Sequence, residues 1–336
     1  MAYEGKGVWC VGEVRHGDLS PSLFELITAG RIIADARSET LTAVLIGKGV
    51  AAKADEVAAR GADKILVLEH DALDQLVDEA HTGALTAAAG TEKPRTLLFS
   101  ASVYGRSVAP RVAVALGGAV ASDASALTVT DGKLTLERSA FGSAVISTVA
   151  VNAADGPEVV TTAPMAFERS GTSETKAEVT QAAVDPASWT QNTEFVSFSA
   201  DESKEIDLGG AEKIVSGGRG LGNADNFSLI RDLAKSLGAA VGASRAVVDS
   251  GWIPYKHQVG LTGRQVRPRL YVACGISGQI QHLAGMKSSD VIVAINTDAD
   301  CPMMKLATYS VKGDLTQIIP AIVSEIDKVR GSSNGS

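Results

Sequence analysis

Three glycine-bearing turns in the C-terminal part of the chain combine residue types that hold phosphorylated ligands. The first reads Ser216-Gly-Gly-Arg-Gly-Leu-Gly222 and lies between an apolar run and a helical pattern. Glycines let backbone N–H groups approach a phosphate, and the start of a helix adds favourable partial charge. Arg219 offers a forked contact to phosphate or a flat surface for an aromatic ring. A tight strand–helix turn with a surface arginine fits the same residues, and the spacing is not the GxGxxG of nicotinamide sites.

The second turn reads Cys274-Gly-Ile-Ser-Gly-Gln-Ile-Gln-His282 and has the same strand–turn–helix pattern. Ser277 is of the type that caps helix N-termini, and the pattern predicts that it does so here. Gln281 and His282 then fall in the first helical turns, where the helix dipole favours an anion. The alternative is a capped helix that contains a structural, partly buried histidine.

The third segment joins Gly242-Ala-Ser-Arg245 with Gln258-Val-Gly-Leu-Thr-Gly263. Small residues around one arginine and one threonine favour a flat ligand close to the backbone, although an ordinary loop fits equally well. Such turns follow predicted parallel strands, and ligands of open α/β sheets bind at that end of the strands. The chain has no HExxH or GxxxxGK[ST] motif and no defensible Ser–His–Asp order. These polar groups are therefore predicted to hold a cofactor that supplies the chemistry.

The elements expected around the three turns form an α/β domain. Apolar runs predict strands at residues 214–216, 270–274 and 291–295. Periodic patterns predict helices at 226–237 and 314–329, and a further helix that opens at Ser277.

The first half of the chain repeats a strand–helix pattern four times, which is typical of an open parallel sheet. The predicted strands are 8–14, 41–46, 64–68 and 96–99, and the later helices are 51–60, 72–89 and 107–116. In the first helix, Ser22 and Glu25 have capping-box spacing. The buried face expected for this helix consists of Leu23, Ile27, Gly30 and Ala34.

After residue 123 the pattern changes to short strands. Asp131-Gly132 separates two alternating runs and predicts a hairpin with a two-residue turn. Further strands at 145–151 and 159–162 are interpreted as an antiparallel edge that completes the first domain.

A chain of 336 residues favours two domains. The expected division is an N-terminal α/β domain at 1–204, in which about 169–204 is a linker, a cofactor domain at 205–330, and a disordered tail at 331–336.

Composition excludes several classes of protein. The net charge is −8 and no cluster of Lys and Arg is present, which argues against nucleic-acid binding. The three cysteines form no CxxC pair, so neither zinc nor an iron–sulfur cluster is expected. No apolar run reaches the ~20 residues of a membrane span. The first residues lack a secretory pattern, so a cytoplasmic protein is expected.

The segments 216–222, 238–249 and 270–296 resemble the α subunit of electron-transfer flavoproteins almost throughout, and 23–35 and 105–113 resemble it more loosely. The resemblance implies an adenine-nucleotide-hydrolase-like first domain and an FAD-binding second domain of the deoxyhypusine-synthase, Rossmann-like type. It implies an electron carrier rather than a stand-alone enzyme, paired with a β subunit that carries AMP or a second FAD.

The same resemblance implies the route of the electrons. They come from a flavin dehydrogenase, such as the acyl-CoA dehydrogenase of fatty acid β-oxidation, or from NADH. They pass to a quinone reductase, or to ferredoxin or flavodoxin. Segment 23–35 is most similar to electron-bifurcating members of the family.

Residue roles also follow from the resemblance. It implies that Arg219 contacts the FAD phosphates, that Ser244 and Arg245 lie beside the flavin, and that Asn296 and Asp314 hold the adenosine. Arg245, Thr262 near flavin N5 and His282 near O2 would tune the flavin potential by favouring negative charge on the reduced ring. The implied FAD-contacting residues are Arg219, Gly220, Ser244, Arg245, Gln258, Val259, Gly260, Leu261, Thr262, Ser277, Gly278, Gln279, Ile280, Gln281, His282, Asn296, Asp314 and Leu315.

The sequence also departs from the family pattern. Leu261 stands where glutamine is usual, and Gln279 stands where alanine is common. Segment 296–310 keeps the family's pattern but lacks its usual APIF and ADYG. One alternative function is a nicotinamide-dependent oxidoreductase, which would need an acidic ribose-binding residue about 20 residues after the first glycine turn. It would also need a proton-transfer group, and no convincing pair of such residues is present. A nucleotide-binding regulatory protein is the third interpretation.

Overall fold

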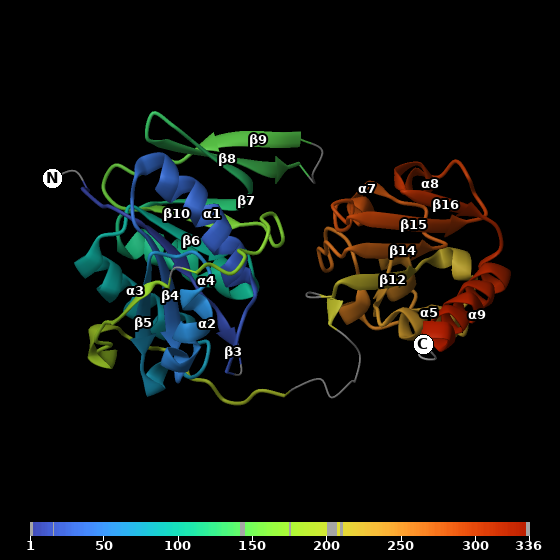
Figure 1. Cartoon of the computed structure of the whole chain (residues 1–336), viewed down its shortest axis with the longest axis horizontal. Coiled ribbons are helices and arrows are strands. Elements are labelled where there is room, and N and C mark those ends of the chain that lie inside the picture. Colours follow the sequence, from blue (N-terminus) through green and yellow to red (C-terminus); the bar gives the residue numbers. More distant parts are fainter. Residues whose placement is uncertain are drawn as a thin grey trace. The chain divides into compact units, whose positions relative to one another are not determined.

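The computed structural model describes residues 3–15, 17–141, 145–174, 176–199, 207–208 and 211–333. The chain divides into two compact units, residues 1–199 and 200–336. Each unit has its own sheet, with helices packed against it (Figure 1). The predicted α/β class is confirmed for both units.

The first unit contains a nine-stranded sheet in the order β11-β5-β4-β1-β6-β10-β7-β8-β9. All neighbours from β11 to β7 are parallel, and β8 pairs antiparallel with both β7 and β9. The strands are β1 Val8–Val11, β4 Leu41–Gly47, β5 Lys64–Glu69, β6 Thr96–Ser100, β7 Ala119–Thr130, β8 Lys133–Ala140, β9 Val145–Ala150, β10 Glu158–Thr162 and β11 Glu178–Gln181.

Among the described residues of this unit, a small ribbon and four α-helices complete the fold. The ribbon pairs β2 Val14–Arg15 with β3 Asp18–Leu19. The helices are α1 Ser22–Arg37, α2 Ala54–Ala58, α3 Asp78–Glu92 and α4 Val103–Ala115, and 3-10 turns lie at Val50–Lys53, Asp71–Leu73 and Pro186–Ser188. The Asp131-Gly132 hairpin is confirmed, because β7 and β8 pair across it.

Strand β10 does not lie where the sequence pattern placed it. It is a parallel strand between β6 and β7, and all five of its residues are buried. Its first residue, Glu158, accepts hydrogen bonds from the Arg37 guanidinium at 2.7 and 2.9 Å and from Oγ1 of Thr96 at 2.6 Å. Because these partners satisfy the carboxylate inside the protein, a charged residue begins a central strand. The predicted antiparallel edge is therefore limited to β7, β8 and β9.

Helix α1 begins at Ser22 without the predicted capping box. Pro21 precedes the helix and no side chain caps it. Glu25 is buried and accepts a hydrogen bond from the backbone N–H of Met165 at 2.8 Å instead. The buried face predicted for this helix is confirmed for Leu23, Ile27, Gly30 and Ala34.

The segment interpreted as a linker contains ordered structure that belongs to the first unit. Within it, β11 pairs in parallel with β5, and Trp189 packs against the core beside α3 and α4. Residues 175 and 200–204 of that segment lie outside the described residues. Of the predicted disordered tail, residues up to Ser333 belong to the last helix, and 334–336 lie outside the described residues.

The second unit contains a five-stranded parallel sheet in the order β13-β12-β14-β15-β16. Its strands are β12 Lys213–Gly217, β13 Ala240–Ala243, β14 Leu270–Cys274, β15 Val291–Asn296 and β16 Tyr309–Lys312. Its helices are α5 Phe227–Leu237, α6 Arg245–Asp249, α7 Ile280–Leu283, α8 Pro302–Leu306 and α9 Leu315–Ser333, with 3-10 turns at Arg219–Leu221 and Tyr255–His257.

Side chains of this sheet alternate between two cores. Val272 and Cys274 of β14 pack on the face that α5 and α9 cover, and Tyr271 and Ala273 pack on the opposite face. Helix α7 opens at Ile280 rather than Ser277, and no side chain caps it. The predicted N-cap role of Ser277 is therefore wrong.

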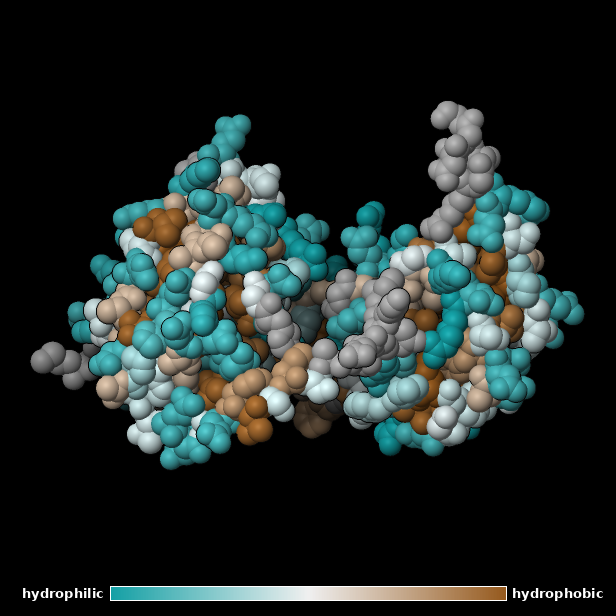
Figure 2. All heavy atoms as spheres, turned by 90° about the horizontal axis from the view of Figure 1, so that it is seen from below, coloured by the Kyte–Doolittle hydropathy of each residue, from teal (hydrophilic) through white to brown (hydrophobic). Residues whose placement is uncertain are grey.

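On the face drawn in Figure 2, hydrophobic residues occur in small separate groups among hydrophilic ones. Across the described ranges, no helix combines the length and the apolar character that a bilayer crossing would require.

Candidate cofactor site

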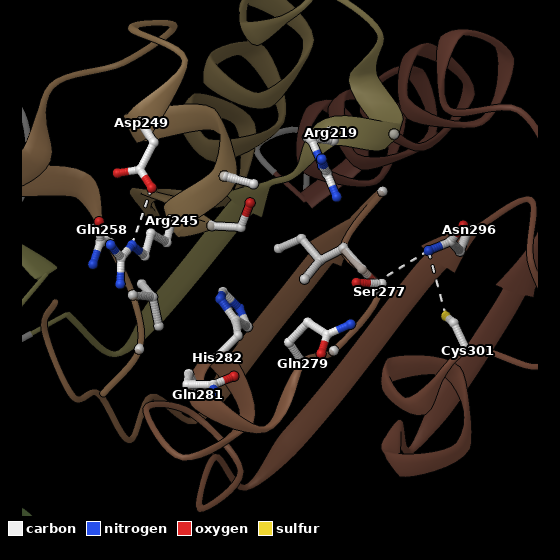
Figure 3. A pocket seen from close by; sticks show the side chains of 18 of the residues that line it. Arg219, Arg245, Asp249, Gln258, Ser277, Gln279, Gln281, His282, Asn296 and Cys301 are labelled. Carbon is white, nitrogen blue, oxygen red and sulfur yellow. Dashed lines mark hydrogen bonds and ion pairs between the residues drawn. The ribbon is translucent and has the colours of Figure 1, made fainter. Parts of the chain in front are cut away.

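A cavity of about 550 Å³ lies in the second unit, at the carboxyl ends of its strands (Figure 3). This volume falls within the roughly 300–1,000 Å³ of small-molecule sites, and the position is the one expected for ligands of open α/β sheets. The lining residues are Arg219, Gly220, Ser244, Arg245, Ala246, Asp249, Gln258, Val259, Gly260, Leu261, Thr262, Gly275, Ile276, Ser277, Gly278, Gln279, Gln281, His282, Asn296, Asp298 and Cys301.

Three residues predicted to contact the cofactor do not line this cavity. The Ile280 side chain is 66% exposed. Asp314 lies just before α9 and accepts two hydrogen bonds of 2.8 Å from Thr316. Leu315 is buried in the core on the α5 and α9 face of the sheet. Helix capping thus accounts for Asp314 and core packing for Leu315, whereas Ile280 is exposed to solvent.

The structure also adds lining residues that the sequence analysis did not single out. They are Ala246, Asp249, Gly275, Ile276, Asp298 and Cys301. The sequence could have indicated one of them. Asp249 follows Arg245 by four residues in a helix, and residues at this spacing lie on one face.

One end of the cavity carries unpaired hydrogen-bond donors. The backbone N–H groups of residues 276–279 donate to no acceptor within the described ranges. Ile276 and Gly278 are buried, so these two groups lie at residues with little access to solvent. The guanidinium of Arg219 also makes no hydrogen bond or ion pair within those ranges, and it points toward the loop of Ser277 in Figure 3. Consecutive free N–H groups beside a cation form an anion site.

The glycines of the first turn have a different role from the one predicted. Their N–H groups were expected to approach a phosphate. Instead, Gly218 donates to the Cys274 carbonyl at 2.9 Å and Gly220 donates to the Gly275 carbonyl at 3.0 Å. A Cβ atom on Gly220 would lie 2.6 Å from the Gly275 Cα. The first turn therefore holds the second turn in place, and the second turn presents the free N–H groups.

Arg245 is paired with an acidic neighbour at the cavity. It opens α6, and its Nε donates a hydrogen bond of 3.1 Å to Oδ2 of Asp249 (Figure 3). The two side chains are 65% and 60% exposed. Solvent therefore screens the pair, and the carboxylate offsets part of the positive charge that Arg245 brings to the cavity.

His282 brings a buried polar atom to the site that is without a partner. Its Nε2 lies 3.0 Å from the Tyr271 hydroxyl, whereas its buried Nδ1 makes no hydrogen bond of ordinary geometry with the described residues. Burial lowers the pKa of His282 to about 4, although the Val259 backbone opposes the shift. The imidazole is therefore neutral at pH 7 and has an unused nitrogen.

Asn296 positions the loops around the cavity. Its Nδ2 donates to the Ile276 carbonyl at 3.2 Å and to Sγ of Cys301 at 3.5 Å, and its Oδ1 accepts from the Asp298 N–H at 3.1 Å. Most of the capacity of this amide is thus used within the protein.

The end of β13 bears on the nicotinamide alternative. In dinucleotide folds, an acidic residue at the end of the second strand binds the ribose hydroxyls. Here β13 ends at Ala243 and is followed by Ser244.

As for metals, a cluster of three or more His, Cys, Asp or Glu side chains that could bind an ion is absent from the described part of the chain.

Comparison with known proteins identifies the family. The electron transfer flavoprotein domain matches residues 8–187, and the electron transfer flavoprotein FAD-binding domain matches residues 207–287. An electron transfer flavoprotein subunit alpha of Syntrophomonas wolfei is 39% identical, over 96% of this chain and 99% of that protein.

Two further relatives are similar over nearly the full length. The electron transfer flavoprotein subunit alpha of Thermoanaerobacterium thermosaccharolyticum is 38% identical, over 97% of this chain and 99% of that protein. The acryloyl-CoA reductase electron transfer subunit beta of Anaerotignum propionicum is 34% identical, over 96% and 95%. FAD is accordingly the cofactor of the second unit. The chain belongs to the family of electron transfer flavoprotein alpha subunits.

Proposed function

We propose that FAD occupies the cavity of the second unit and that the chain carries electrons through it. The observation that supports this most is the run of unpaired N–H groups at 276–279 beside the unpaired Arg219. Together they offer a pyrophosphate both hydrogen bonds and a positive charge. The flavin ring lies toward Arg245, Thr262 and His282, and the adenosine extends past Asn296 and Asp298.

The residues present fit this cofactor. A neutral His282 with an unused Nδ1 suits the polar edge of a flavin ring, and buried groups of this kind need a partner. Bound FAD supplies electron transfer in steps of one or two electrons, and the protein supplies binding, orientation and electrostatics. Arg245 favours negative charge on the ring, and Asp249 moderates that effect.

A comparison of ligands with and without phosphate tests the placement of the pyrophosphate. Replacing Arg219 by alanine should weaken FAD and FMN by about 10- to 100-fold, because a hydrogen bond to a charged group contributes roughly 1.5–3 kcal/mol. Riboflavin should bind as it does to the wild type. The matched control is Arg269→Ala, since Arg269 is exposed in the same unit and does not line the cavity. Equal weakening of riboflavin and FAD by Arg219→Ala would refute this placement.

The chain works beside a β subunit that carries AMP or a second FAD. Names of its relatives as alpha subunits support this pairing. The donor is a flavin dehydrogenase such as acyl-CoA dehydrogenase, or NADH, and the acceptor is a quinone reductase, ferredoxin or flavodoxin. The acryloyl-CoA reductase in the name of the Anaerotignum propionicum relative supports a donor or acceptor that acts on acyl-CoA compounds.

Co-purification with the β subunit tests this assembly and separates two modes of action. A heterodimer with AMP and FAD would work as a simple shuttle, whereas FAD in both subunits would support electron bifurcation. Acid release of the bound nucleotides, followed by chromatography, measures this ratio. A stable, flavin-loaded homodimer that is indifferent to the β subunit would contradict the proposed pairing.

A further inference from the structure

A chain of buried hydrogen bonds leads from the interior of the second sheet to the cavity. The Tyr271 hydroxyl donates a 2.7 Å hydrogen bond to Oγ of Ser216, and it lies 3.0 Å from Nε2 of His282. Ser216 and Tyr271 are fully buried on the neighbouring strands β12 and β14, and His282 is 7% exposed. His282 thus reaches the cavity from a fixed internal anchor.

The Ser216 hydroxyl, which begins this series of hydrogen bonds, occupies space that the sheet leaves free beside Gly242. Gly242 faces Ser216 across β12 and β13. A Cβ atom at Gly242 would lie 2.1 Å from Oγ of Ser216, which is closer than real Cβ contacts. The hydroxyl of Ser216 is therefore accommodated because residue 242 has no side chain.

The protons available in this series of hydrogen bonds determine the tautomer of His282. The single O–H proton of Tyr271 is directed to Ser216, so the Tyr271 oxygen can only accept from His282. Nε2 must then carry a proton, and in a neutral imidazole the proton cannot also be on Nδ1. Burial keeps His282 neutral against the opposing effect of the Val259 backbone, so its Nδ1, which has no hydrogen-bond partner, carries the lone pair.

We infer that Tyr271 is a positioning residue, which together with Ser216 holds His282 as the Nε2–H tautomer with Nδ1 available to the cofactor. This inference rests on the proposed place of FAD in the cavity. In this state His282 would accept a hydrogen bond from a donor on the ring edge beside O2, because O2, near which the resemblance places His282, is itself an acceptor. If reduction placed negative charge on bound FAD, Nδ1 would be the atom able to take up a proton from solvent, and the Tyr271 oxygen would support the resulting imidazolium.

The two anchor residues predict different outcomes when they are removed. In Ser216→Ala, the Tyr271 hydroxyl loses its acceptor and turns to donate to Nε2, so His282 changes to the Nδ1–H tautomer. In Tyr271→Phe, Nε2 loses its partner, and neither tautomer is favoured. Long-range ¹H–¹⁵N spectra of chain labelled with ¹⁵N-histidine read the tautomer directly, and the loss of one signal in His282→Gln assigns it. We expect the Nε2–H pattern in the wild type.

The potential of bound FAD provides a second reading in the complete heterodimer. Tyr271→Phe should lower the equilibrium constant for reduction roughly tenfold, which is about 59 mV for a one-electron couple. The matched control is the other buried histidine–tyrosine pair, in the first unit, where Nδ1 of His81 lies 3.0 Å from the Tyr104 hydroxyl. Tyr104→Phe should change the His81 signal and leave the potential as it is.

The outcomes separate this inference from the proposed function. Wild-type protein without bound flavin would contradict the proposed function. The tautomer of His282 would still test the positioning role of Tyr271 and Ser216. If FAD binds but both Ser216→Ala and Tyr271→Phe retain the Nε2–H pattern and the wild-type potential, the positioning role is refuted and the cofactor site stands.

Discussion

Nε2 of Gln258 donates a hydrogen bond of 3.0 Å to Oγ1 of Thr262, and both residues line the cavity. Gln258 is buried at 2% exposure, so its amide is a fixed donor. A hydroxyl whose oxygen already accepts one hydrogen bond directs its own proton to another acceptor. Gln258 thereby prepares Thr262 to donate to a ligand.

Removal of this hydroxyl should change the flavin potential without releasing the cofactor. In Thr262→Val the side chain keeps its shape but has no donor. A neutral hydrogen bond contributes about 0.5–1.5 kcal/mol, so we expect a shift of roughly 10–30 mV in the two-electron potential. Thr262→Ser keeps the hydroxyl and is the control. A potentiometric titration in which valine and serine variants behave alike would argue against the role of Thr262.

Arg245 and Asp249 should act in opposite directions on the same potential. Arg245→Ala removes a positive charge and should lower the potential, whereas Asp249→Asn removes the offsetting negative charge and should raise it. Both side chains are well exposed, so the shifts should be tens of millivolts or less and should diminish as salt increases.

Arg245→Lys should fall between the wild type and the alanine variant, because it keeps the charge but loses the flat guanidinium. Spectroelectrochemical titration of each variant, with FAD bound in equimolar amount, measures these shifts. Wild-type potentials in all three variants would mean that the pair acts only at the surface.

The contact between the two glycine turns should be intolerant of a side chain. Gly275 has a φ of +65°, and a Cβ there would lie 2.8 Å from the Gly220 Cα. Gly238→Ala is a matched control, since Gly238 has a φ of +61° and open space around it. The backbone strain alone is about 1–2 kcal/mol, and the clash should add roughly 1–3 kcal/mol for Gly275→Ala. Urea unfolding compares the two, and equal losses would show that the turns separate easily.

The buried His81 should make the first unit sensitive to acid. Burial lowers the pKa of His81 to about 4, against an ordinary value of 6.5. Below pH 6.5 the unfolded chain binds a proton that the folded chain excludes until about pH 4. The free energy of unfolding should therefore fall with decreasing pH in this window, by up to ~1.4 kcal/mol per pH unit from this group. His81→Gln should lose this share, which unfolding curves at pH 7, 6 and 5 measure.

The strand–turn–helix positions around the cavity could be predicted because glycines and apolar runs are local signals. Ser277 shows the limit of such reasoning. It follows a strand and precedes a helix as a cap would, but Gly278 has a φ of +83°, with room for no Cβ against the Met303 backbone. That long-range contact delays the helix to Ile280 and leaves the N–H groups of the loop unpaired. No local pattern shows it.

Partners far apart in the sequence explain the other differences. Glu158 reads as a surface residue until its neighbours Arg37 and Thr96 are known. The resemblance implies that Leu315 contacts the cofactor, whereas in the structure its side chain lies beside Gly275 and belongs to the core. Tyr271 reads as an ordinary strand residue, and only the structure connects its hydroxyl to Ser216 and His282.

Blocking the cavity tests most directly whether it holds FAD. Ser277 lines the cavity, is exposed, and its side chain makes no hydrogen bond within the described ranges, so Ser277→Trp should fill the space without disturbing the fold. Flavin is then counted by absorbance in heterodimers of matching circular dichroism. The wild-type heterodimer should contain one FAD in this chain, in addition to any FAD of the β subunit, and the tryptophan variant should lose one equivalent. FMN in place of FAD, or an unchanged flavin content in a folded Ser277→Trp heterodimer, would contradict the account.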